Sequence, residues 1–181
     1  MALIDTSRVR SELTKIRKTK NAATKGKLLE ALIAYVFCCV PGVSLDDQDV
    51  INNYQTEEID LIFWNHQERD GFRFLDCPLI IECKGWSAPV SGREVRYFAD
   101  LLEDKGRRNG ILMALNGITG SEDDLTASFF HTAVAMARGV QVLVITGAEL
   151  EALIDSSDLV RLLKRRMLEL TKHQIQVFKG G

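Results

Sequence analysis

Apolar residues recur with the spacing of one helix face near the start of the chain, at Ile4, Val9, Leu13 and Ile16. This spacing predicts a short amphipathic helix over residues 5–17 with a basic outer face. A second helix is predicted from Thr24, which can cap it, to about Cys39, where Pro41-Gly42 stops it. The chain is therefore expected to begin with two helices.

The middle of the chain reads as short strands joined by short connections. Strands are predicted around 50–54, from 59 to 64 and from 78 to 84, with a polar insert at 66–71. Such short connections imply an antiparallel meander. The four apolar residues of 78–81 make an edge position less expected for the third strand.

The rest of the chain alternates helices and strands. Ser91 and Glu94 form the pattern of a capping box, which predicts a helix ending near Lys105-Gly106. The elements predicted after it are a strand at 111–115, a helix at 122–138, a strand at 140–145, a capping box from Thr146 to Glu149, and a basic helix from Ser156 or Ser157 to about Lys172. Strand, helix and strand at this spacing require a parallel right-handed crossover, so a mixed sheet is expected. The last helix is free to pack on the core or on a second subunit.

Composition limits the class of protein. A chain of 181 residues with 46% hydrophobic content can bury a substantial core, and one domain is expected. The longest mostly apolar run, 31–40, is about half of the roughly 20 residues that a membrane span needs. The N-terminus has no signal-peptide hydrophobic region, and the four cysteines lack zinc-site spacing. A cytoplasmic protein with reduced thiols and no membrane partner is the expectation.

Charge is unevenly distributed, although the net charge is only −2. Residues 1–27 hold eight Lys and Arg against two acids, a local charge of +6, whereas residues 46–60 hold six acids and no base. The acidic segment suits metal binding but would repel phosphates unless a cation were present. The basic segment is either a nucleic-acid surface or a solvated helix face, and the sequence leaves both open.

Candidate chemistry is concentrated on two of the predicted strands. Because alternate side chains of a strand share a face, Glu82 and Lys84 lie on one face of their strand. If the neighbouring strand pairs beside it, Asp60 adds a second carboxylate. The backbone carbonyl of Cys83 is a further oxygen ligand. Two hard oxygen ligands beside an ammonium make a site for a divalent metal and a water.

Phosphodiester hydrolysis would use all of these groups. A Mg²⁺ on the carboxylates bridges a phosphate oxygen and offsets the developing charge, and Lys84 orients or deprotonates the attacking water. The plainer reading of Glu82 and Lys84 is a solvated ion pair on an edge strand. Further basic residues near the predicted cleft either grip phosphates or are simply solvated: Arg93, Arg96, Lys105, Arg107 and Arg108.

The ordered residues resemble the PD-(D/E)XK nuclease superfamily, and within it the Mrr-like restriction endonucleases. The resemblance runs from about Lys25 to Ile154 and rests on Gly26-Lys27-Leu28-Leu29-Glu30, Glu58-Ile59-Asp60 and Ile81-Glu82-Cys83-Lys84. It implies an α/β fold with a restriction-endonuclease-like αβββαβ core, a mixed central sheet flanked by helices and extra C-terminal elements. The first 24 residues would be a basic helical extension, and 25–181 a single nuclease-like domain.

The resemblance also implies roles for individual residues. Asp60 and Glu82 would bind the metal, Lys84 would activate water, and Glu30 would be an auxiliary acid of the first core helix. On its position alone, Glu30 is the polar border of an amphipathic helix. No Pro precedes Asp60, which departs from the family pattern.

The function implied is a Mg²⁺-dependent endonuclease, with Mn²⁺ able to substitute, acting on duplex DNA. Target choice would come from a partner, a homodimer or modified DNA. Two alternatives remain open: a catalytically silent DNA-binding or scaffolding module, and a junction-resolving or RNA-directed nuclease of the same fold.

Overall fold

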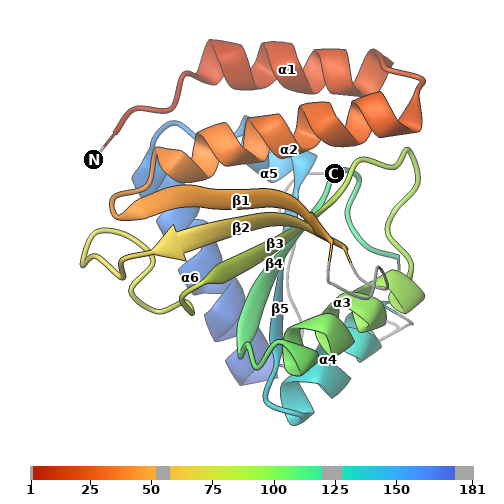
Figure 1. The fold of residues 1–181 in the computed structure, drawn as a ribbon, viewed down its shortest axis with the longest axis vertical. Helices are drawn as coiled ribbons and strands as arrows, with labels where there is room; N and C mark the ends of the chain where they lie inside the picture. The colour runs from red at the N-terminus through yellow and green to blue at the C-terminus, as the bar shows by residue number, and fades with distance from the viewer. Residues whose placement is uncertain (1, 52–57, 120–127, 174–181) are drawn as a thin grey trace.

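The computed structural model describes residues 2–51, 58–119 and 128–173 (Figure 1). The described helices are α1 (Thr6–Lys18), α2 (Ala22–Cys38), α3 (Gly92–Asp104), α4 (Ser128–Ala137), α5 (Gly147–Glu151) and α6 (Ser156–His173). The described strands are β1 (Val43–Ile51), β2 (Glu58–Asn65), β3 (Leu79–Lys84), β4 (Asn109–Ala114) and β5 (Gln141–Thr146).

The five described strands form one mixed sheet in the order β1-β2-β3-β4-β5. The pairs β1–β2 and β2–β3 are antiparallel, and the pairs β3–β4 and β4–β5 are parallel. This is the predicted meander followed by parallel crossovers, and the predicted α/β fold class is confirmed. It places β3 at the centre of the sheet.

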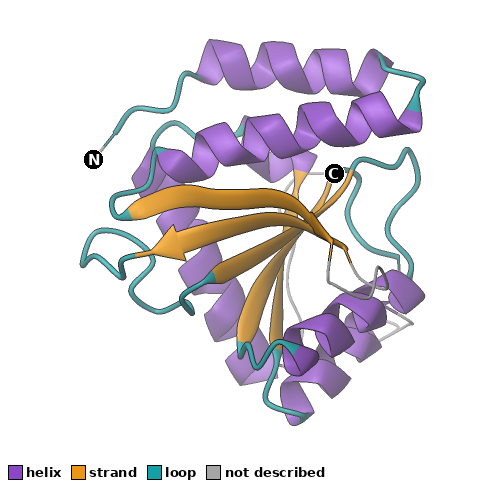
Figure 2. Cartoon of the chain, viewed as in Figure 1, coloured by secondary structure: helices purple, strands orange, loops and turns teal. Residues whose placement is uncertain are grey.

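Helices cover both faces of this twisted sheet (Figure 2). One face packs against α1, α2, α5 and α6 in the larger of two hydrophobic cores, which includes Leu61 and Ile81 of the sheet and Leu13 of α1. The other face packs against α3 and α4, and its core includes Ile80. Because strand side chains alternate, the residues of β3 divide between the two cores, so neither face is left to solvent.

The two N-terminal helices form a hairpin over the sheet. Asp5 caps α1 by accepting a hydrogen bond from the backbone N–H of Arg8, and α1 then runs close to the predicted 5–17. Asn21 rather than Thr24 caps α2, and its Oδ1 accepts from the Thr24 N–H at 2.9 Å. The predicted cap was therefore three positions too late, because the first turn of α2 contains Ala22 and Ala23, which show no apolar stripe.

Two strand and helix boundaries differ from the pattern-based prediction. β1 begins at Val43, well before Val50, because it is an edge strand whose residues are mostly polar and exposed, so no hydrophobic alternation marks it. The predicted part at 52–54 lies outside the described residues, as does the part at 122–127 of the helix predicted over 122–138.

The C-terminal helix packs on the core of its own chain. Leu159, Leu163 and Leu170 of α6 are fully buried in the larger core. On the same helix Arg166 is fully buried; it donates to the Val144 carbonyl of β5 at 3.2 Å and pairs with Glu149 of α5. The capping box of Thr146 and Glu149 forms as predicted, so this acid both caps α5 and holds α6. No described helix is long and apolar enough to cross a lipid bilayer.

Candidate nuclease site

The site begins where β2 and β3 separate. Their paired residues end at Leu61 opposite Ile81, one position before Asp60 and Glu82. Beyond that point the Asp60 carboxylate accepts a hydrogen bond from the Cys83 backbone N–H, at 2.6 Å from Oδ2 to N. The side chain thus takes the place of a backbone strand pairing and links the two strand ends beside the acids.

Glu82 and Lys84 lie together on the face of β3 that points toward α3. Lys84 Nζ is 2.8 Å from Glu82 Oε1 and 3.5 Å from Oε2 of Glu94, the third residue of α3. Glu82 is only 6% exposed and β3 is a central strand, so the reading of a solvated pair on an edge strand is wrong. Burying an ion pair carries a desolvation cost, which is offset only by good geometry and additional hydrogen bonds.

Burial also changes the acidity of these groups. Burial first, and then the neighbouring Asp60 carboxylate, raises the pKa of Glu82 from 4.5 to about 7, against the opposing effect of Lys84. Burial likewise raises the pKa of Asp60. For Lys84, burial lowers the pKa, but the Glu82 carboxylate outweighs it and the net pKa is raised. Asp60 and Glu82 are therefore two acids close to the single ammonium of Lys84. An additional cation would favour the ionised form of both acids.

Glu30 reaches the same region from α2. Its side chain is nearly buried, with Lys27 Nζ 3.3 Å from Oε2. Burial raises the pKa of Glu30, and the nearby charges of Asp60 and Asp49 add to the effect. Lys27 also pairs with Asp49 of β1, so one ammonium bridges two acids on different elements. Glu30 is thus a buried acid that feels the charge of Asp60, not a solvated residue at a helix border.

Cys83 can contribute only its backbone to this chemistry. Its side chain belongs to the larger core, and burial raises the pKa of its thiol well above the ordinary value. A buried thiol of this kind is not a nucleophile at neutral pH. The carbonyl of Cys83 remains the predicted oxygen ligand.

The acids present a suitable donor set for a hard divalent cation, although within the described ranges no three His, Cys, Asp or Glu side chains are already grouped as a metal site. Asp60 and Glu82 offer carboxylate oxygens from adjacent strand ends. Burial raises the pKa of both, and for Glu82 the nearby charge of Asp60 raises it further. Mg²⁺ characteristically uses one or two carboxylates and completes its coordination with water and phosphate. The residues fit such an ion.

A cavity of about 540 Å³ adjoins the site. Asp60 and Lys84 line it on one side together with Trp86, whose ring lies 5.4 Å from Lys84 Nζ and is 43% exposed. Lys20 lines it from the turn between α1 and α2, and Lys25 lines it from the N-terminal part of α2. The cavity therefore joins the candidate catalytic residues to the N-terminal hairpin.

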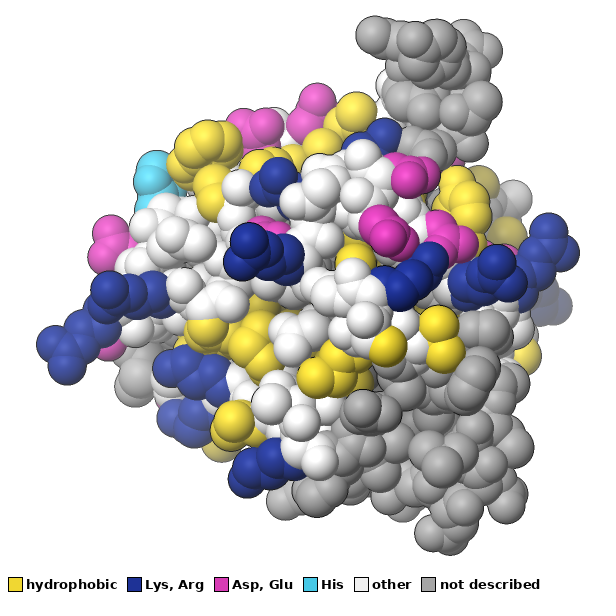
Figure 3. Space-filling view, turned by 90° about the horizontal axis from the view of Figure 1, so that it is seen from below, with side chains coloured by type: hydrophobic (Ala, Val, Ile, Leu, Met, Phe, Trp, Pro, Cys, Tyr) yellow, Lys and Arg dark blue, Asp and Glu magenta, His cyan; other side chains and the backbone are white. Residues whose placement is uncertain are grey.

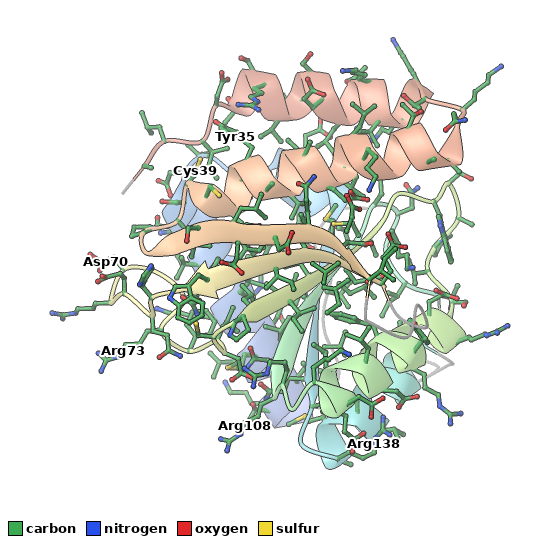
Figure 4. The ribbon with its side chains drawn as sticks, in the orientation of Figure 1. Tyr35, Cys39, Asp70, Arg73, Arg108 and Arg138 are labelled. Atoms are coloured by element: carbon green, nitrogen blue, oxygen red, sulfur yellow. The ribbon has the colours of Figure 1, made fainter. Side chains whose placement is uncertain are left out.

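Several basic residues considered from the sequence lie elsewhere. Arg107 and Arg108 precede β4, whereas Lys84 is paired with Ala114 at the far end of that strand. Arg107 donates to the Cys77 carbonyl at 2.9 Å. Figure 4 labels Arg108 low in the view, away from α1 and α2, and Figure 3 shows the Lys and Arg side chains of the lower face in several separate groups. These two residues do not line the cleft.

Sequence reasoning missed two members of the site. Glu94 was read as half of a capping box, but Ser91 makes no side-chain cap hydrogen bond and Glu94 turns to Lys84 instead. Asp49 was read only as part of an acidic segment. Its φ of +55° is a left-handed conformation that Asp tolerates, and its carboxylate pairs with Lys27. Neither contact has a local sequence signal, because each joins separate elements.

A model of a known protein family matches most of the chain. The model of a family described as a restriction endonuclease, Mrr_cat, matches residues 24–154. This range includes Glu30, Asp60, Glu82 and Lys84, and it leaves α1 and α6 outside. A comparison with curated proteins finds no match.

Proposed function

Because the chain belongs to the Mrr_cat restriction endonuclease family, of the PD-(D/E)XK type that its sequence predicted, we propose that it is a divalent-metal-dependent endonuclease hydrolysing phosphodiesters in duplex DNA. The observation that carries this proposal is the meeting of Asp60, Glu82 and Lys84 where β2 and β3 separate. Membership of this family by itself supports a nuclease of the restriction-endonuclease type.

Asp60 and Glu82 are the proposed metal ligands, with the Cys83 carbonyl as a third. A bound Mg²⁺ would polarise a phosphate oxygen and stabilise the charge that develops during in-line attack. The chain prepares for this by fixing its acids: the Cys83 N–H holds Asp60, and Lys84 holds Glu82. Preorganised groups avoid the cost of reorganisation during the reaction.

Lys84 is the proposed water-positioning residue. Since its pKa is raised, its ammonium keeps its proton at neutral pH and donates hydrogen bonds rather than accepting a proton. It can therefore orient the attacking water and stabilise the charged phosphate. Glu82 and Glu94 fix its direction at 2.8 and 3.5 Å. Glu30 is proposed as an auxiliary acid that acts through the charge it places beside Asp60.

Double-strand cleavage requires one such site for each strand. We infer that a twofold dimer or a partner subunit supplies the second site and takes part in target choice. The oligomeric state of the purified protein, measured with and without DNA, tests this part separately from catalysis.

The experiment compares supercoiled plasmid, single-stranded DNA and RNA as substrates, each with Mg²⁺, Mn²⁺ or EDTA. Asp60→Ala and Lys84→Ala should lose cleavage, and Asp104→Ala, an exposed acid near the end of α3, should retain it. Preferred cleavage of single-stranded DNA or RNA would overturn the duplex assignment. Metal-dependent binding of DNA without cleavage by any variant would favour the silent module instead.

A further inference from the structure

The N-terminal hairpin forms one wall of the cavity beside the candidate site. Arg17, Thr19 and Lys20 line the cavity although they precede residue 24, where the family match begins. The hairpin is fixed to the core rather than loosely attached, because Val9 and Ile16 of α1 are fully buried there. In Figure 1 the turn between α1 and α2 stands above the loop that follows β3.

This wall lies beside the loop that directly follows β3. The loop after β3 approaches α2 so closely that a Cβ at Gly85 would lie 3.5 Å from Lys25 Cγ. Gly85 itself directly follows Lys84. The basic wall and the candidate catalytic ammonium therefore face one space of about 540 Å³.

Positive charge dominates the lining of that space. The basic side chains that line it are Arg17, Lys20, Lys25 and Lys84, and the acidic one among the described residues is Asp60. Arg17 is already paired with Glu151 of α5, at 3.0 Å. Within the part of the chain that the structure describes, Lys20 and Lys25 have no acid partner. The positive end of the α2 dipole adds to this field, since Ala22 at its first turn also lines the cavity.

Two nearby acids have a cation of their own. Glu30 and Asp49 share the Lys27 ammonium, and neither lines the cavity. An anionic chain in the cavity would thus meet the ammonium groups of Lys20 and Lys25 on the hairpin side.

We propose that Lys20 and Lys25 bind the phosphates of the nucleic-acid strand next to the bond that is cleaved. The proposal rests on the proposed nuclease function and adds a substrate-binding surface from outside the matched family region. Lysine is a flexible point charge, so these contacts supply affinity and register without reading sequence. On this proposal, the N-terminal hairpin contributes part of the nucleic-acid binding surface.

The test measures binding of a fluorescein-labelled DNA duplex of mixed sequence by anisotropy in EDTA, so that no cleavage occurs. Lys20→Ala/Lys25→Ala is compared with Lys15→Ala/Lys18→Ala, which removes the same charge from exposed positions of α1 outside the cavity. The first variant is expected to bind roughly tenfold more weakly near 0.1 M salt, and its plot of log K against log salt should be shallower by about 1.8. Equal thermal midpoints for both variants establish that the hairpin is folded.

Equal affinity of the two double variants would overturn the proposal, as would a wild-type protein that fails to bind DNA even at low salt. The nuclease proposal fails by a different result. If wild type binds the duplex through Lys20 and Lys25 but does not cut it with Mg²⁺ or Mn²⁺, the binding surface stands and the catalytic assignment falls.

Discussion

Glu82→Gln is expected to stabilise the metal-free protein at alkaline pH while it abolishes catalysis. The carboxylate of Glu82 is buried beside Asp60, and this raises its pKa from 4.5 to about 7. Gln has nearly the same shape and carries no charge. The substitution therefore removes the cost of ionising a buried acid while leaving the packing of β3 largely unchanged.

The magnitude follows from the shift in pKa. Below pH 4.5 the carboxyl is protonated in both the folded and the unfolded chain, so its full contribution to stability is present. As the pH rises from 4.5 to 7, the unfolded chain ionises first and the folded state loses stability. Above pH 7 the loss is complete and amounts to about 3 kcal/mol, at 1.36 kcal/mol for each pH unit between the two pKa values.

The assay is urea denaturation in EDTA at a series of pH values for wild type and Glu82→Gln. The difference in unfolding free energy between the two proteins should move in favour of the variant by about 3 kcal/mol between pH 4 and pH 8. Curves that stay parallel over this range would refute the argument, because they would mean that Glu82 ionises in the folded protein as easily as in water.

Four further outcomes are expected. Mg²⁺ should raise the thermal midpoint of wild type but not of Asp60→Ala, measured by scanning calorimetry, because only an intact site binds the ion in the folded state. Glu94→Gln should lower the cleavage rate by up to about fivefold, since Lys84 loses its weaker, partly exposed partner; an unchanged single-turnover rate would remove Glu94 from the site. Arg166→Ala should lower the unfolding free energy by about 3 kcal/mol, because it removes the buried partner of Glu149 and leaves that acid only the longer pair with Arg165, at 3.9 Å. Arg161→Ala, on the exposed face of the same helix, should change it by less than about 0.5 kcal/mol, and equal losses in the two variants would contradict the role of the buried pair.

Local patterns predicted the elements whose signals are local. The helix from Thr24 to about Cys39, the strand at 59–64 and the capping box at Thr146 all depend on residues that are close in sequence, and all are found. β1 was mostly missed because an exposed edge strand has no buried face to mark it. The capping box predicted at Ser91 and Glu94 was wrong, because Glu94 pairs with Lys84 of β3 instead.

The candidate site likewise has some features that the sequence predicted and others that it did not. Asp60, Glu82 and Lys84 were predicted because strand alternation and neighbouring strands determine where they point. The Asp60 contact with the Cys83 N–H and the Lys27 bridge to Asp49 depend on where two strands stop pairing and on how α2 crosses β1. Nor does the sequence pattern show that the turn between α1 and α2 closes over the site, because that placement follows from the packing of α1 on the larger core.

Nicking of supercoiled plasmid tests the central claim most directly, with wild type and Asp60→Asn compared in Mg²⁺ and in EDTA. The account predicts nicked or linear product from wild type with Mg²⁺ alone, and none from the variant under either condition. Cleavage that persists in Asp60→Asn, or that proceeds equally well in EDTA, would contradict a metal-dependent site at the ends of β2 and β3.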